Sequence, residues 1–205
     1  MSKAESIFVW LIIGPVIPVV LFLTGWWTSL IFVTDRTVFV FGLLGLGIGC
    51  LIDFIFVRQW ISKVYTCRPI ILAVVYVFYS ICVFGFFMGV PIFNITIGII
   101  AGVFMGRKFY HLGMAKEQLN GSILKVSIFS ASIMGLISVA SAYFATKDIT
   151  DTALNLRGMF KLPFLPTAEM IIALIIFGGL GLITVQYWLT KRCILWSNQL
   201  GIRIS

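Results

Sequence analysis

The sequence has little charge. Only 11% of its 205 residues are charged, whereas soluble domains carry about 25%. Hydrophobic residues make up 60% of the chain, and the mean hydropathy is +1.11. This balance excludes an ordinary soluble domain and predicts an integral membrane protein in contact with the lipid bilayer.

Residues that hold metals or carry out common catalysis are scarce. His111 is the single histidine, so the sequence does not support haem held by paired histidines or a histidine-based zinc site. No C-x-x-C, G-x-S-x-G, phosphate-binding loop or H-E-x-x-H motif occurs. We therefore expect no metal and no cofactor, and an enzyme is the least supported of the function classes.

Acidic residues are also few, at 7 against 15 lysines and arginines, which gives a net charge of +8. In a soluble protein this excess would suggest nucleic acid as a partner. Here the basic residues flank apolar runs, where they are typical of signals that orient membrane helices. We expect no nucleic-acid partner.

The longest apolar run covers residues 69–106, which are 38 residues without one charge. A membrane crossing needs about 20 residues, and a single helix of this length would extend for about 57 Å, far beyond a hydrocarbon core of about 30 Å. The run must therefore fold back. Gly89 and Pro91 predict a tight turn between two antiparallel helices.

The whole chain is predicted to form one transmembrane domain, an all-α bundle of six helices. With both termini in the cytoplasm, the inner side holds 11 basic residues and the outer side 4, as the positive-inside rule requires. This format is typical of small multi-pass proteins in the plasma or inner membrane of bacteria and archaea. The predicted helices cover residues 7–27, 37–57, 69–88, 92–110, 126–146 and 169–190, and the long outside loop covers residues 147–168.

The first predicted helix contains two prolines, Pro15 and Pro18. Each removes a helical hydrogen bond, so we expect a kink or break near the middle of the bilayer. One interpretation is a kinked packing helix. The other is an interrupted helix whose freed carbonyl groups line a solute or ion site, as in transporters.

Asp53 is the one acid predicted to lie inside an apolar span. Burying a carboxylate in lipid is costly, which makes such a residue a candidate functional site. Asp53 also lies five residues before Arg58, about 7 Å along a helix, so it could instead reach interfacial water. A structural role and a role in binding a solute, proton or cation both stay open.

The outside loop and the helix ends beside it carry further polar candidates. Residues 156–160 resemble a short amphipathic helix at the membrane surface, which is either an interfacial segment or a binding loop. Asn94 suits a helix N-cap, and Glu169 suits the positive end of a helix dipole. A functional alternative makes Asn94, Arg157 and Glu169 the outer mouth of a path whose inner part holds Asp53 and Gln186.

Two hypotheses of function follow. The first is passage of a small solute or ion, based on the interrupted helix, Asp53 and the polar helix ends. The second is a structural or accessory subunit, because helices rich in glycine suit self-association or docking onto a larger membrane complex. Cross-linking in membranes, set beside a flux assay, would separate the two.

Overall fold

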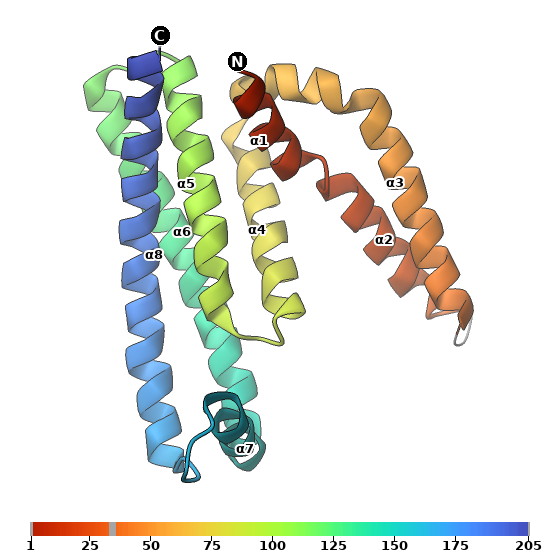
Figure 1. Ribbon diagram of the computed structural model, residues 1–205, viewed down its shortest axis with the longest axis vertical. Coiled ribbons are helices and arrows are strands. Elements are labelled where there is room, and N and C mark those ends of the chain that lie inside the picture. Colours follow the sequence, from red (N-terminus) through yellow and green to blue (C-terminus); the bar gives the residue numbers. More distant parts are fainter. Residues whose placement is uncertain (1, 33–35, 205) are drawn as a thin grey trace. The chain divides into compact units, whose positions relative to one another are not determined.

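The computed structural model describes residues 2–32 and 36–204, and these residues form helices and no strand (Figure 1). The order of elements is α1 (Lys3–Ile13), α2 (Val16–Ser29), α3 (Arg36–Lys63), a 3₁₀ helix η1 (Val64–Thr66), α4 (Pro69–Phe86), a 3₁₀ helix η2 (Pro91–Phe93), α5 (Asn94–His111), α6 (Lys116–Lys147), α7 (Ile149–Phe160) and α8 (Ala168–Ile204).

The prediction of an all-helical chain is confirmed for the described residues. The prediction of six spanning helices is confirmed for their length and their composition. Six segments of the described chain are long and apolar enough to cross a membrane, with α1 and α2 together forming the first. A helix suits lipid because it satisfies its own backbone hydrogen bonds. Several helices extend beyond the predicted apolar spans, and the largest extensions are those of α3 to Lys63, of α6, which begins at Lys116, and of α8, which continues to Ile204. Hydropathy detects only the apolar part of a helix. The helix itself can continue into the polar sequence on either side.

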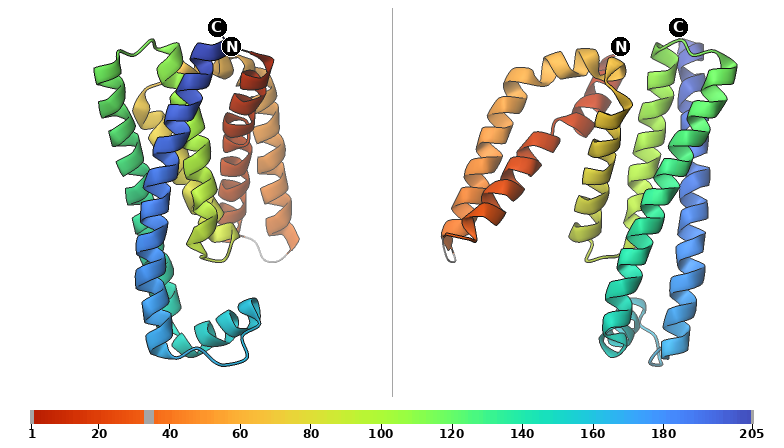
Figure 2. Two further views of the ribbon diagram at one scale, coloured as in Figure 1. Left: turned by 60° about the vertical axis from the view of Figure 1, so that its left-hand side comes forward. Right: turned by 180° about the vertical axis from the view of Figure 1, so that it is seen from behind.

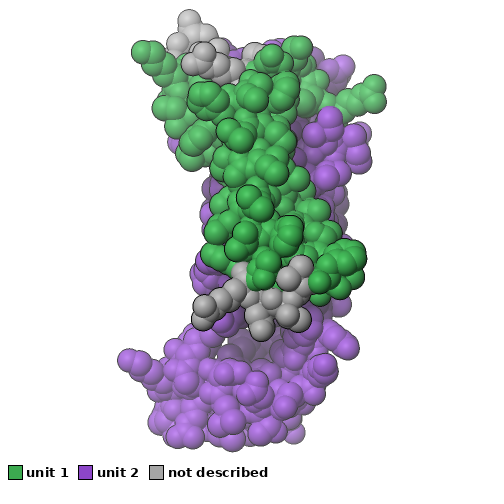
Figure 3. All heavy atoms as spheres, turned by 90° about the vertical axis from the view of Figure 1, so that its right-hand side faces the viewer, with its two compact units in different colours: residues 1–69 green, residues 70–205 purple. Residues whose placement is uncertain are grey.

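The helices gather in two compact units, residues 1–69 and residues 70–205, which Figure 3 colours separately. The prediction that the chain forms one transmembrane domain stays a prediction. Each unit has its own packing, and each is described by itself.

In unit 1 the first spanning segment is broken between α1 and α2, at Gly14 and Pro15 (Figure 1). Pro18 lies inside the first turn of α2. The N–H groups of a first turn have no acceptor within their helix, so the missing N–H of Pro18 costs α2 no hydrogen bond. α2 and α3 then pack with their backbones in close contact. A Cβ atom at Gly25 would lie 2.5 Å from the carbonyl oxygen of Phe41, and one at Gly49 would overlap the backbone of Pro18.

In unit 2 the apolar run folds into the predicted hairpin of α4 and α5. Its turn holds Met88 and Gly89 at positive φ, +53° and +82°, and glycine adopts this conformation without strain. Phe87 and Phe93 stack across the turn with ring centroids 3.8 Å apart. The turn is therefore closed by an aromatic contact as well as by backbone geometry.

α5, α6 and α8 pack together in unit 2 (Figure 2). α5 runs parallel to α8, because Gly98 faces Gln186 and Gly106 faces Ile194. α6 runs antiparallel to α8 and packs against it through small residues. The side chain of Ser138, for example, lies 3.9 Å from the Cβ position of Gly179.

The predicted amphipathic segment of the long loop forms α7, which lies across the end of α6 (Figures 1 and 2). The side chain of Asp148 caps it by accepting a hydrogen bond from the N–H of Asp151 at 2.9 Å. The hydroxyl of Thr152 donates to the carbonyl of Ala145 at 2.9 Å and ties α7 to α6. α7 ends at Phe160, and the next residue, Lys161, has left-handed backbone geometry.

Candidate functional site

Gln186 lies at the centre of a buried hydrogen-bond network in unit 2. Its side chain is 1% exposed, and its amide donates to the hydroxyl of Tyr76 at 3.0 Å and to that of Ser130 at 2.8 Å. Tyr76 and Ser130 also bond to each other at 2.8 Å, and Ser130 bonds to the hydroxyl of Thr190 at 3.1 Å. We call Tyr76, Ser130, Gln186 and Thr190 the polar cluster. It joins α4, α6 and α8.

A glycine of α5 makes room for the polar cluster. A Cβ atom at Gly98 would overlap the side-chain amide of Gln186, so any larger residue here would displace that amide from its hydrogen bonds. The hydroxyl of Thr190 also reaches the carbonyl of Gly98, at 3.4 Å. The close approach of α5 to α8 therefore adds a backbone acceptor to a site built from three other helices.

The polar cluster lies in the half of the spanning helices nearer their basic flanks. Gln186 precedes Lys191 by five residues, Ser130 follows Lys125 by five, and Tyr76 follows Arg68 by eight. At 1.5 Å per residue these separations are about 7 to 12 Å. The cluster therefore sits at one depth on all three helices, inside the apolar span.

Several buried polar atoms around the cluster have no hydrogen-bond partner within the described residues. They include Oε1 of Gln186, the hydroxyls of Ser80 and Ser127, and both polar atoms of the Asn94 amide. Ser80 lies one turn from Tyr76 on α4, and Asn94 lies one turn from Gly98 on α5. Buried polar groups are nearly always paired, so these atoms mark a place where water or a polar ligand would be stabilised.

Asn94 does not act as the predicted helix cap. Its side chain is 2% exposed and makes no hydrogen bond in the described structure, and the N-cap position of α5 belongs to Phe93. The cap interpretation is wrong because η2 runs directly into α5, which leaves no extended residue at which a side chain folds back on the first turn.

Asp53 is buried within unit 1, 8% exposed, beside the break between α1 and α2. A methyl group at Gly14 would lie 3.0 Å from one oxygen of its carboxyl group, Oδ2. The other oxygen, Oδ1, has no hydrogen-bond partner in the described residues. The carboxyl group of Asp53 therefore lies beside the backbone at the break between α1 and α2.

Arg157 and Glu169 are both exposed, on α7 and in the first turn of α8. In the described part of the chain, no hydrogen bond or ion pair joins their side chains to each other or to Asn94. The structure therefore brings Asn94 and Gln186 to one region of α5 and α8, through Gly98, and does not add Arg157 or Glu169 to it. Their role at an outer mouth stays a prediction.

Sequence analysis missed Tyr76, Ser80, Ser130 and Thr190. Each is a hydroxyl residue within an apolar run, and such residues often bond to their own helix, so no local signal separates these four from Thr146 or Thr184, which do so. The long-range partners become visible only once the helices are packed.

No group of three or more His, Cys, Asp or Glu side chains that could hold a metal ion occurs in residues 2–32 and 36–204. Comparison of the chain with models of protein families, with curated proteins and with solved structures finds no match. Any function must therefore be argued from the sites themselves.

Proposed function

We propose that this multi-pass membrane protein binds a small polar solute or ion among its spanning helices and moves it across the membrane. One observation carries the proposal. Polar atoms that are buried in apolar spans have no hydrogen-bond partner among the described residues, both at Asp53 in unit 1 and at Asn94 and Gln186 in unit 2.

The energetics favour a ligand at these positions. A buried polar group without a partner costs about 1 to 3 kcal/mol, and a charged one costs more. Polar and ionisable residues inside membrane spans commonly mark the pathways of ions and solutes. A cargo that supplies the missing partners would be stabilised there.

The two places suit different kinds of cargo. Asp53 offers a carboxyl group beside the break at Gly14, which suits a proton or a cation. The polar cluster and Asn94 offer uncharged donors and acceptors, which suit a molecule that forms hydrogen bonds.

Flux into proteoliposomes tests the proposal. The purified full chain would be assayed with protons, Na⁺, K⁺ and small uncharged solutes. We expect flux of at least one of these, and we expect Asp53→Asn to lower a cation or proton flux at least tenfold. Glu117→Gln is the matched control, because this exposed acid in the first turn of α6 lies outside both sites.

Equal flux in the wild type and in Asp53→Asn would remove Asp53 from the pathway. If no member of the panel crossed faster than in empty liposomes, the proposal of transport would fail.

A role as a subunit of a homo-oligomer or a larger membrane complex is the second candidate. Gly178 and Gly181 of α8 favour it, because a Cβ atom at either would meet nothing within 4 Å and the helix surface there is open to a partner. Cysteine cross-linking in native membranes tests this role. Replacing both glycines with leucine would abolish a specific cross-link, and a protein that stays monomeric in both forms would exclude it.

A further inference from the structure

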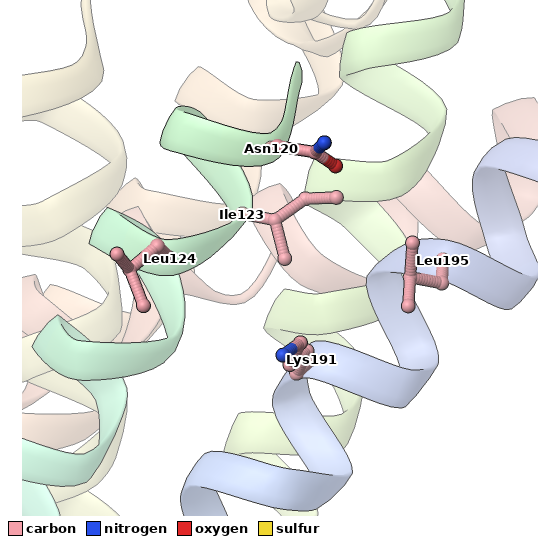
Figure 4. Close-up of a pocket in the computed structure, with 5 residues that line it drawn as sticks. All are labelled: Asn120, Ile123, Leu124, Lys191 and Leu195. Carbon is pink, nitrogen blue, oxygen red and sulfur yellow. The ribbon is translucent and has the colours of Figure 1, made fainter. Parts of the chain in front are cut away.

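A groove lies between α6 and α8, away from the polar cluster, at the basic ends of these helices (Figure 4). Its volume is about 260 Å³. Figure 4 shows Asn120 and Ile123 reaching from α6 toward α8, with Lys191 and Leu195 on the other wall. Leu124 completes the lining, so the groove combines aliphatic walls with one cation and one amide.

The floor of the groove is part of the packed interior of unit 2. Ile123 is 3% exposed and forms a hydrophobic core with Phe109 of α5 and Ile194 of α8, and Leu195 packs against this core. Because close-packed interiors deform little, the floor of the groove is held in place by this packing.

The polar groups of the groove are available for a ligand. The ammonium group of Lys191 lies 5.9 Å from the ring centroid of Tyr187 and makes no ion pair with any described residue. The side-chain amide of Asn120 likewise makes no hydrogen bond within the described chain. Both side chains are exposed.

The position of the groove along the helices corresponds to the membrane–water interface. Lys191 is the first charged residue of α8 after 21 uncharged residues, and Asn120 and Leu124 precede Lys125, at which the apolar part of α6 begins. Trp188, whose ring lies beneath the guanidinium of Arg192, is at the same level along α8. Tryptophan is enriched at membrane–water interfaces, so its position supports an interfacial groove. A ligand here would meet lipid headgroups on one side and acyl chains on the other.

The charge around the groove is positive. Glu117 is the one acid of the sequence at this end of α5, α6 and α8, whereas those helices carry seven basic residues there. These seven are Arg107, Lys108, Lys116, Lys125, Lys191, Arg192 and Arg203. Such an excess attracts an anionic ligand and does not attract a cation.

We propose that the groove between α6 and α8 is a binding site for an anionic phospholipid of the adjacent leaflet. Lys191 pairs with the phosphate, the Asn120 amide donates a hydrogen bond to a phosphate or ester oxygen, and the first methylene groups of an acyl chain lie against Leu124 and Leu195. Basic pockets between membrane helices bind anionic headgroups in this way. The site does not depend on whether the chain moves a solute.

Lipid titration of the delipidated full chain in detergent tests the proposal, with native mass spectrometry as the readout. Phosphatidylglycerol and phosphatidylcholine with identical acyl chains would be compared. We expect the wild type to retain phosphatidylglycerol preferentially, and Lys191→Gln to weaken its binding about fivefold, since one basic residue at a membrane surface contributes about 1 kcal/mol. Asn120→Leu should weaken it as well.

The matched control is Arg192→Gln, which removes the same charge from the next residue, outside the groove. We expect it to change binding less than twofold. Equal losses in Arg192→Gln and Lys191→Gln would overturn the site, since they would indicate a diffuse charge effect. Equal retention of phosphatidylcholine, no retained lipid, or full competition by glycerol 3-phosphate in place of the lipid would each overturn it too.

Discussion

Single hydroxyl groups tie the helices of unit 2 together, and Tyr76 is the clearest case. Its hydroxyl bonds both Ser130 of α6 and Gln186 of α8, although the ring belongs to α4. We predict that Tyr76→Phe lowers the free energy of unfolding by about 0.6 kcal/mol and by no more than about 1.7, the range of such bonds in membrane proteins. Reversible unfolding in micelles measures it.

Tyr143→Phe is the control for this loss, because the Tyr143 side chain is 64% exposed. A double-mutant cycle of Tyr76→Phe with Ser130→Ala should show a coupling free energy. If the two losses simply add, the bond between the hydroxyls contributes nothing to stability.

At Asn94 we expect one substitution to have opposite effects on stability and on transport. Its amide is buried without a partner, so an apolar residue of similar size removes a penalty of about 1 to 3 kcal/mol. We predict that Asn94→Leu raises the thermal unfolding temperature and lowers the solute flux of proteoliposomes. A variant that is less stable and transports normally would contradict both statements.

Pairs of helices are held by backbone contact, and α3 shows how strictly a position is constrained. A Cβ atom at Gly49 would overlap the backbone of Pro18 in α2, whereas one at Gly47 would meet nothing within 4 Å. We predict that Gly49→Ala destabilises unit 1 by about 1 to 3 kcal/mol through overpacking. Thermal unfolding of the full chain measures the change.

Gly47→Ala is the matched control two residues away on the same helix. It should be neutral or stabilising by up to about 1 kcal/mol, because alanine favours the helix more than glycine does. Equal destabilisation by both substitutions would mean that α2 and α3 do not pack through Gly49.

Six spanning helices fix an even number of crossings for the whole molecule. We predict that a reporter after Lys116, at the start of α6, lies on the same side as both termini. That side should be the cytoplasm, because the basic residues concentrate there. A reporter at Asn155 in α7 should lie on the opposite side.

Alkaline phosphatase and fluorescent protein fusions give the readout for this topology. A reporter after Lys116 that was active outside the cell would reduce the number of crossings. The positions of Asp53, Asn94 and Gln186 relative to the two membrane faces would then have to be assigned again.

Hydropathy and charge determined the helical class, the six apolar spans and the amphipathic α7, and Gly89 with Pro91 determined the turn. Lipid acts on each segment separately, so the side chains of one segment are enough to decide its insertion. Only the tertiary structure decided that Gln186 bonds Tyr76, 110 residues away, and that Gly98 makes room for it. Such partners depend on which helices approach closely, and small residues that permit close approach are common on many helix faces of this sequence.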